Sequence, residues 1–125
     1  MVFDILSELE SYENSFPEIR NVIDIMDRSL PYEKGEGTYN CPENDRVTYS
    51  VNEILTSDKG ISFNVEANHS ALIITLEGEQ VVSYNDVDKV FILSEGRFLL
   101  VNEGVWRIAM TPNLPTQIKY CIFNW

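Results

Sequence analysis

Histidine, cysteine and positive charge are scarce in this chain. Among 125 residues it has one histidine, His69, and two cysteines, Cys41 and Cys121, and its nine lysines and arginines face 20 acids, for a net charge of −11. One histidine cannot supply the several imidazole ligands common in catalytic metal sites, and a nucleophilic cysteine would have only His69 as its base. Because such an acidic surface repels phosphate backbones and anionic lipid, we expect neither nucleic acid nor membrane as a partner.

Several familiar sequence signals are also missing. There is no phosphate-binding glycine loop, nucleophile elbow or Cys-x-x-Cys pair. No apolar run approaches the ~20 residues of a membrane span, and the start Met-Val-Phe-Asp lacks the basic and apolar stretches of a signal peptide. We therefore expect a cytoplasmic protein whose two cysteines are free thiols. The length suits a single domain, residues 1–125, and a hydrophobic content of 44% can form its core.

The first thirty residues have helical patterning. Asp4 to Glu10 predicts a short amphipathic segment, and Ser15-Phe16-Pro17-Glu18 is typical of a helix start. The apolar residues that follow recur at helical spacing, and Pro31 is expected to end the helix; they are Ile19, Val22, Ile23, Met26 and Leu30. Residues 1–30 are therefore expected to form a helical segment in front of a β-region at 37–125.

After Pro31 the apolar pattern changes to period two, which is typical of strands. The predicted strands centre on Val47–Val51, Ile61–Val65, Leu72–Leu76, Gln80–Tyr84, Val90–Leu93, Phe98–Val101, Val105–Met110 and Ile118–Phe123. Turn signals such as Asp58-Lys59-Gly60, Glu77-Gly78 and Glu95-Gly96 separate them. Short strands at this spacing predict a mainly β protein with an antiparallel sandwich or barrel.

A small closed β-structure offers its mouth or interior as a binding site. Polar or aromatic residues that face inward would mark that site, and the candidates are Tyr49, Asn64, Glu66, Thr75, Tyr84 and Trp106. Glu66 shares one face of its strand with Ser62 and Asn64. If that face lines a barrel, burial would raise the pKa of Glu66 and let it transfer protons; if it faces water, it has no chemical role. Glu66 and His69 could also hold a metal, although a local turn is the simpler interpretation of His69.

Five segments in a fixed order carry a family resemblance over Met1 to about Phe123. They are "MVFDIL", "LPYEKGEGTYNC", "VTYSVNEILT", "LEGEQVVSY" and "EGRFLLVNEGVWRIAM". Their succession resembles the YhcH/YjgK/YiaL family, which includes the small subunit of the evolved β-galactosidase. The resemblance implies a cupin-like double-stranded β-helix, or jelly roll, with one or two N-terminal helices. It also implies sugar metabolism and a pocket that holds a divalent metal on glutamate and histidine ligands.

The metal ligands of that family are not retained in this chain. Alignment on Leu76-Glu77-Gly78-Glu79 places Asn64 at the family's glutamate and Glu66 at its histidine. Ala71 and Ile73 replace an inward aspartate and glutamine, and the family's second histidine falls on Asn113, with Thr111 at its aspartate. A gapped alignment restores Glu66 and His69 as a metal pair, but it deletes three residues inside a strand and so reverses the alternation.

We therefore expect a cupin-like protein that binds a small carbohydrate or sugar acid without a catalytic metal. The predicted ligand-binding residues are Asn64, Glu66, Asn113, Tyr49 and Trp106. Two alternatives remain: a sugar anomerase or isomerase with Glu66 as the proton-transfer group, and a non-catalytic accessory subunit of a glycosidase or a regulatory protein. If a metal such as zinc is present, Glu66 and His69 are its predicted ligands. By analogy with other cupin-like domains, a homodimer is a further expectation.

Overall fold

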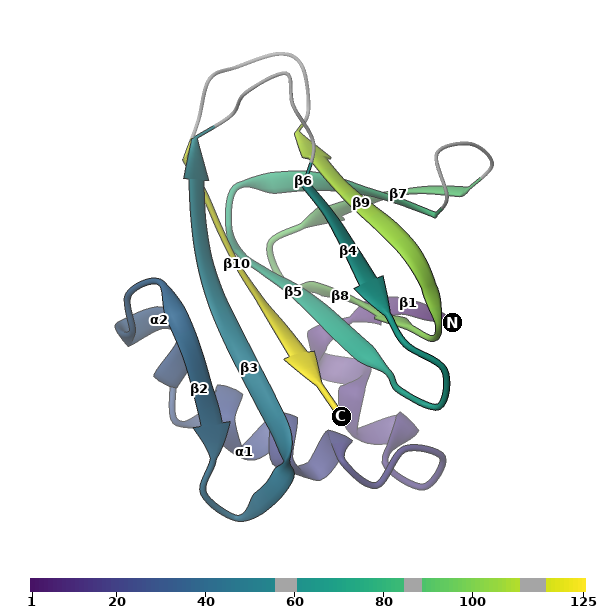
Figure 1. Ribbon diagram of the computed structural model, residues 1–125. Coiled ribbons are helices and arrows are strands. Elements are labelled where there is room, and N and C mark those ends of the chain that lie inside the picture. Colours follow the sequence, from purple (N-terminus) through teal and green to yellow (C-terminus); the bar gives the residue numbers. More distant parts are fainter. Residues whose placement is uncertain (56–60, 85–88, 111–116) are drawn as a thin grey trace.

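The computed structural model describes residues 1–55, 61–84, 89–110 and 117–125 (Figure 1). The chain begins with a strand, β1 (Val2–Ile5), followed by a 3₁₀ helix, η1 (Leu6–Tyr12), and two α-helices, α1 (Ile19–Asp27) and α2 (Leu30–Glu33). The expectation that residues 1–30 are purely helical is therefore wrong at its start. Pro31 does not end a helix either, because it lies in the first turn of α2, after Ser29 has turned the chain with a φ of 55°.

Together with β1, the remaining strands form two antiparallel sheets that face each other. Their bounds are β2 (Gly37–Cys41), β3 (Asn44–Leu55), β4 (Ile61–Val65), β5 (Ala71–Glu77), β6 (Glu79–Tyr84), β7 (Lys89–Ser94), β8 (Arg97–Val101), β9 (Gly104–Met110) and β10 (Gln117–Asn124). A six-stranded sheet has the order β1-β8-β5-β10-β3-β2, and a four-stranded sheet has the order β4-β9-β6-β7. Each strand predicted from period-two patterning is present, whereas β1 and β2 were not predicted.

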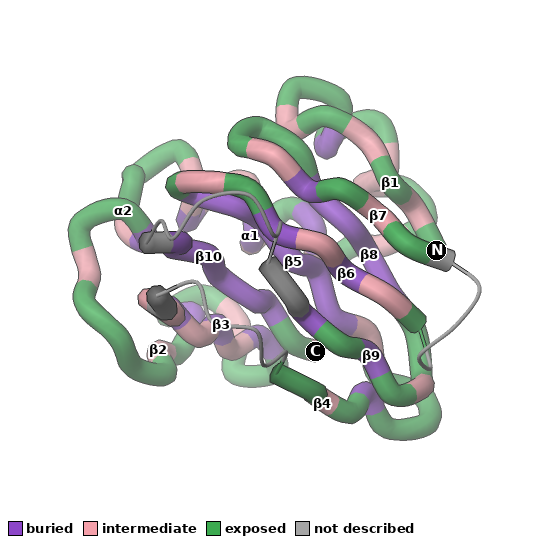
Figure 2. Tube along the Cα trace, turned by 90° about the horizontal axis from the view of Figure 1, so that it is seen from above, coloured by how far each residue is buried: buried purple, intermediate pink, exposed green. Residues whose placement is uncertain are grey.

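The helices cover one face of the six-stranded sheet and the four-stranded sheet lies over the other (Figure 1). Alternation along β10 shows the division: Cys121 and Phe123 pack toward the helices, and Tyr120 and Ile122 pack between the sheets. Figure 2 shows the buried residues concentrated along β5, β8 and β10. The six-stranded sheet is thus buried on both faces, which explains why all of Ala71 to Leu76 is buried.

Burial of this continuous apolar sheet supplies the main stabilisation of the fold. Full burial of one aliphatic or phenylalanine side chain contributes roughly 1.5–3 kcal/mol, and twelve of the largest side chains are exposed by less than 2%. On the helix side, α1 contributes Ile19, Val22 and Ile25, which are completely buried. Among the described residues, no helix has the length and apolar character needed to cross a membrane. Both cysteines are buried and unpaired, which confirms the free-thiol prediction.

Candidate functional site

The turn between β4 and β5 lies at one end of the two-sheet structure, beside the end of β10. The backbone N–H of His69 donates to the carbonyl of Glu66 over 3.1 Å, and Asn68 adopts a φ of 65° within the turn. Ser70 and Trp125 then form a reciprocal backbone pair, with N···O distances of 2.9 and 3.2 Å. This pairing fixes the turn against the C-terminal residues, so that His69 and Asn124 line the same depressions.

Two adjoining depressions at this end form what we call the polar groove. One, of about 170 Å³, is lined by Asn64, Val65, Glu66, His69, Ser70 and Asn124. The other, of about 330 Å³, is lined by Arg46, Thr48, Asn68, His69, Asn124 and Trp125. His69 and Asn124 line both depressions, so the two depressions share these residues as a common wall.

The polar groove offers hydrogen-bond donors, acceptors and one aromatic surface. Its amides can each donate and accept, Glu66 can accept, and Arg46 carries a planar cation suited to a carboxylate. The Arg46 side chain is 76% exposed and lies 3.9 Å from a Glu18 oxygen, a separation at which a surface ion pair contributes little. Arg46 is therefore accessible to a ligand. Trp125 is half-buried and lines the same depression.

The structure corrects the expected position of Asn64 and Glu66. In β4 the alternation directs Phe63 and Val65 into the core between the sheets, so Asn64 lies on the outer side of the strand and is exposed. Glu66 follows the strand and is also exposed. Glu66 therefore faces water, which is the second of the two alternatives given for its side of the strand. It lacks the low-dielectric surroundings that would make it a general base.

Tyr49 and Trp106 lie in the two cores and do not line the polar groove. Tyr49 is 2% exposed on the helix side of β3, with its ring stacked on that of Phe123 at 5.3 Å between centroids. Trp106 is 4% exposed between the sheets, where its indole N–H donates to the Asn102 carbonyl over 3.2 Å. Both are buried, and their predicted role in ligand binding stays a prediction. Asn113 lies outside the described residues, so its predicted role stays a prediction.

The donor set around Glu66 and His69 does not fit a zinc-type site. Both residues line the smaller depression, whose other polar lining residues are amides and a serine. Within the described ranges, no group of three or more His, Cys, Asp or Glu side chains could hold a metal ion. Structural zinc sites use ~4 ligands and catalytic ones ~3 protein ligands. We therefore derive no chemistry through a metal at this position.

Among the described residues, Thr75 and Gln80 form a polar pair in the interior between the sheets, and both are completely buried. Gln80 Nε2 donates to Thr75 Oγ1 over 2.8 Å, and Thr75 Oγ1 donates to the Leu93 carbonyl over 3.0 Å. Tyr120 lies opposite Thr75 in the neighbouring strand, and burial, with a smaller effect from the Glu36 carboxylate, raises the pKa of its phenol. Thr75 is thus an inward-facing candidate between the sheets, as Trp106 is.

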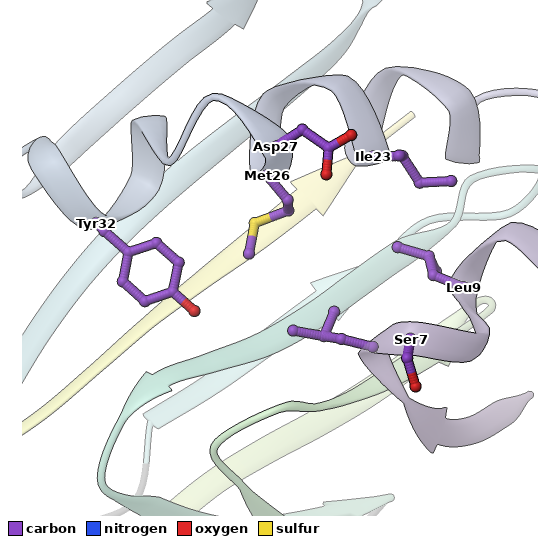
Figure 3. Close-up of a pocket in the computed structure, with 7 residues that line it drawn as sticks. Ser7, Leu9, Ile23, Met26, Asp27 and Tyr32 are labelled. Atoms are coloured by element: carbon purple, nitrogen blue, oxygen red, sulfur yellow. The ribbon is translucent and has the colours of Figure 1, made fainter.

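A separate groove of about 320 Å³ lies on the helix side of the molecule (Figure 3). Its lining consists of Leu6, Ser7, Leu9, Ile23, Met26, Asp27 and Tyr32. Side chains from η1, α1 and α2 converge on it, and most of them are apolar. It offers less hydrogen-bonding chemistry than the polar groove, because Asp27, Ser7 and Tyr32 are its polar side chains.

Sequence reasoning missed most of the polar groove. It identified Asn64, Glu66 and His69, but not the residues that β3, β10 and the turn bring beside them: Arg46, Thr48, Asn68, Asn124 and Trp125. Asn124 and Thr48 are cross-strand partners, a relationship that depends on register and leaves no local signal. Asn68, one position before His69, was the one sign of this turn in the sequence, because asparagine tolerates a positive φ.

Comparison with solved structures identifies the fold. A cupin protein from Bacteroides fragilis matches 74% of this chain and 76% of its own, with a TM-score of 0.59 and 11% identity. A cupin superfamily protein from Desulfitobacterium hafniense matches 73% and 77%, with a TM-score of 0.52 and 18% identity. A cupin-2 domain containing protein from Shewanella frigidimarina matches 85% and 96%, with a TM-score of 0.51 and 15% identity.

These comparisons establish a cupin-like jelly roll and nothing finer. The matched part covers 45% of the other chain in one solved structure and 96% in another. No protein-family model matches the sequence, and no curated protein matches it either. The predicted fold class is therefore confirmed, since both the two-sheet architecture and the structural relatives agree with it.

Proposed function

Starting from a cupin fold with a polar groove at one end, we propose that this protein binds a small carbohydrate or sugar acid there, without a metal. The observation that carries the proposal is the composition of the groove. His69 and Asn124 join two depressions whose lining combines amides, a carboxylate and a guanidinium with the Trp125 indole. A sugar presents the complementary set, because its hydroxyls both donate and accept and its ring has an apolar face.

Arg46 favours a sugar acid over a neutral sugar as the ligand. A guanidinium binds a carboxylate through charge-assisted hydrogen bonds, which are about twice as strong as neutral ones. The surface as a whole carries a net charge of −11 and repels anions, so an acid would bind only where a cation offsets that repulsion. Glu66 at the other end of the groove would accept from ligand hydroxyls.

The sequence resemblance adds a biological setting to this proposal. The ordered segments from "MVFDIL" to "EGRFLLVNEGVWRIAM" support membership of the YhcH/YjgK/YiaL family and a place in cytoplasmic sugar metabolism. The lining around Glu66 and His69, which is otherwise amides and a serine, supports a member that binds without the metal of its relatives. The role of an accessory subunit of a glycosidase receives no separate support from the groove.

Saturation-transfer-difference NMR with glucose and glucuronate tests the proposal, because the two ligands differ by a carboxylate. We expect a larger signal and tighter binding for glucuronate in the wild type. Arg46→Gln should abolish the difference between the two ligands, and Asn64→Ala should weaken binding of both. Asn14→Ala is the matched control: Asn14 is an exposed asparagine that lines neither depression.

Two results would contradict this assignment. Equal weakening in Asn14→Ala would show that the signal reports on the general surface and not on the polar groove. Absence of binding for both sugars, and for a wider panel of hexoses and their acids, would rule out the carbohydrate class. Amide chemical-shift changes in Ser70 and Asn124 would locate the ligand directly.

A further inference from the structure

The groove on the helix side of the molecule, which we call the helix-side groove, has a mostly apolar lining (Figure 3). Its walls come from three elements: η1 supplies Leu6, Ser7 and Leu9, α1 supplies Ile23, Met26 and Asp27, and α2 supplies Tyr32. Ile23 and Met26 pack against the core beneath them but remain half-buried, because their outer surfaces line the groove. The fold thus leaves apolar side-chain surface open between the helices.

Hydrogen bonds hold two walls of the helix-side groove in place. At η1, the backbone N–H of Leu6 donates to the Gly96 carbonyl over 2.8 Å. At α2, the Lys119 ammonium, which comes from β10, donates to the Tyr32 carbonyl over 2.9 Å. Ligand sites are usually largely pre-formed and measure roughly 300–1,000 Å³, and the volume here is about 320 Å³. The groove therefore has fixed walls and the size for a small organic molecule.

Asp27 is the charged side chain in the lining of the helix-side groove. In the part of the chain that the structure describes, it forms no ion pair. Arg28, the next residue, is bound to Glu43 over 2.8 Å. The Lys119 ammonium has a backbone carbonyl of α2 and, at 3.6 Å, the Glu53 carboxylate as its partners. Neither cation neutralises Asp27, so its carboxylate can attract a positively charged ligand.

Tyr32 adds an aromatic face and a hydroxyl to the helix-side groove. Figure 3 shows it at one end of the groove and Leu9 and Ser7 at the other, with Met26 between them. Burial raises the pKa of the Tyr32 phenol, with smaller effects from Cys121 and Glu95, so the hydroxyl stays protonated and can donate or accept. The face of a tyrosine ring attracts a cation. Methionine is flexible and adapts its shape to an apolar ligand.

We propose that the helix-side groove binds a small organic ammonium ion, whose apolar body lies against the aliphatic lining and whose charged group meets Asp27. Burial of apolar surface drives the binding of the body. The carboxylate of Asp27 and the net charge of −11 select a cation and repel an acid. This inference does not rest on the proposed sugar binding, because the helix-side groove and the polar groove share no lining residue.

NMR titration with phenethylammonium, 2-phenylethanol and 3-phenylpropionate tests the proposal, because these ligands share one apolar body and differ in the charge of the end group. All amide shifts should move in η1, α1 and α2. Phenethylammonium should bind about two- to fivefold more tightly than the alcohol, which is the contribution of an exposed ion pair, and the acid should bind most weakly. Ethylammonium, which has the charge without the ring, should leave these amides unshifted.

Substitutions at two lining positions separate charge from apolar contact. Asp27→Asn should abolish the preference for the amine over the alcohol, and Asp27→Lys should reverse the order of the amine and the acid. Asp45→Asn is the matched control, since Asp45 is exposed, lines none of the three depressions described and loses the same charge. Ser7→Trp places an indole at an exposed position of the groove wall and should weaken the binding of all three aromatic ligands.

The same titrations can overturn the proposal. Absence of shifts in the three helices with every aromatic ligand would exclude the site, and equal binding of the amine and the acid by the wild type would exclude its selection of cations. Equal effects of Asp27→Asn and Asp45→Asn would assign the preference to net charge. If Ser7→Trp does not fold, as judged by its melting curve, Asp27→Lys still decides. Sugar-binding signals from the polar groove should be unchanged in all of these variants.

Discussion

The side-chain amide of Gln80 donates to Thr75 Oγ1 over 2.8 Å, while its own carbonyl oxygen, Oε1, has no partner in the described residues. Both side chains are completely buried between the sheets. A buried polar atom without a partner costs free energy, and the removal of one partner from a buried pair costs more than the removal of both.

Opposite changes in stability are expected from substitutions at these two positions. Thr75→Val leaves the Gln80 amide group unpaired as well as its carbonyl, and should lower the free energy of unfolding by roughly 1–3 kcal/mol. Gln80→Met removes the orphaned oxygen and keeps the chain length, so it should be neutral or stabilising. Urea denaturation of both variants measures the difference. A loss in Gln80→Met as large as that in Thr75→Val would show that Oε1 is paired in solution, for example by a buried water.

A hydrogen bond between Tyr12 and Asp4 gives a pH-dependent prediction. Tyr12 Oη donates to Asp4 Oδ2 over 2.6 Å, and this bond, with a second one from the backbone N–H of Ile5, lowers the pKa of the Asp4 carboxyl from its ordinary 3.8. A lowered folded pKa stabilises the protein above the unfolded pKa, and the contribution disappears as the pH falls through the folded pKa. Tyr12→Phe should therefore lower the urea midpoint at neutral pH, and its difference from the wild type should shrink from about pH 4 to about pH 2.

Tyr39→Phe is the control for that experiment. The Tyr39 hydroxyl donates to the Gly35 carbonyl over 2.7 Å, an acceptor that does not titrate. Its effect on the urea midpoint should stay constant over the same acidic range. If the two variants show the same pH dependence, the Tyr12–Asp4 bond is not formed in solution.

Both thiols should resist modification in the folded protein. Cys121 is completely buried in β10, and burial raises the pKa of its thiol, so the reactive thiolate is disfavoured. Cys41 is 2% exposed. We expect no reaction with Ellman's reagent under native conditions and release of two equivalents per chain in denaturant. Rapid labelling of one thiol without denaturant would contradict the packing of the core.

Metal chelation should leave the stability of the protein unchanged. Glu66 and His69 are two ligands, and the smaller depression adds only amides and a serine to them. A protein stabilised by a bound metal loses melting temperature when the metal is removed. The melting temperature should therefore be the same with and without EDTA, and His69→Ala should behave like the wild type in both. A fall with EDTA in the wild type that is absent in His69→Ala would establish a metal site.

Glu66→Gln should leave both stability and sugar chemistry unaltered. Because Glu66 is exposed, its substitution is expected to change the free energy of unfolding by no more than about 0.5 kcal/mol. Exchange spectroscopy on free sugars should show anomer interconversion at the same rate with the variant as with the wild type. A slower exchange in the variant would identify Glu66 as a proton-transfer group and favour the anomerase alternative.

Periodicity predicted the outer strands well because each has one apolar side facing a core, whereas the central strands β5 and β8 are continuous apolar runs buried on both sides. The predicted strand Ile61–Val65 has the bounds of β4, and the apolar Phe63 and Val65 indeed face the core. β2 escaped prediction because Thr38 and Asn40 are polar and exposed at the edge of the sheet. β1 was not predicted because the spacing of Ile5, Leu6 and Leu9 also suits a helix. In the structure the helix η1 begins only where β1 ends.

The candidate site was harder to predict than the fold, since it depends on which strands become neighbours. Local alternation placed Asn64 and Glu66 together, but it could not decide whether their side faced water. The contribution of Asn124 follows from its pairing with Thr48 and Ala71, which are 76 and 53 positions earlier in the chain. Relations over such distances become visible only in the assembled sheet.

The position of β10 constrains the order in which the protein can assemble during synthesis. β10 follows every other described strand in the sequence, yet it fills the middle of the six-stranded sheet between β3 and β5. Until it emerges from the ribosome, β3 and β5 each lack a neighbour and present open edges rich in valine, leucine and isoleucine, which are prone to aggregate. The nascent chain therefore completes its main sheet only after residues 117–124 have been synthesised, and chaperone binding before that moment would protect these edges.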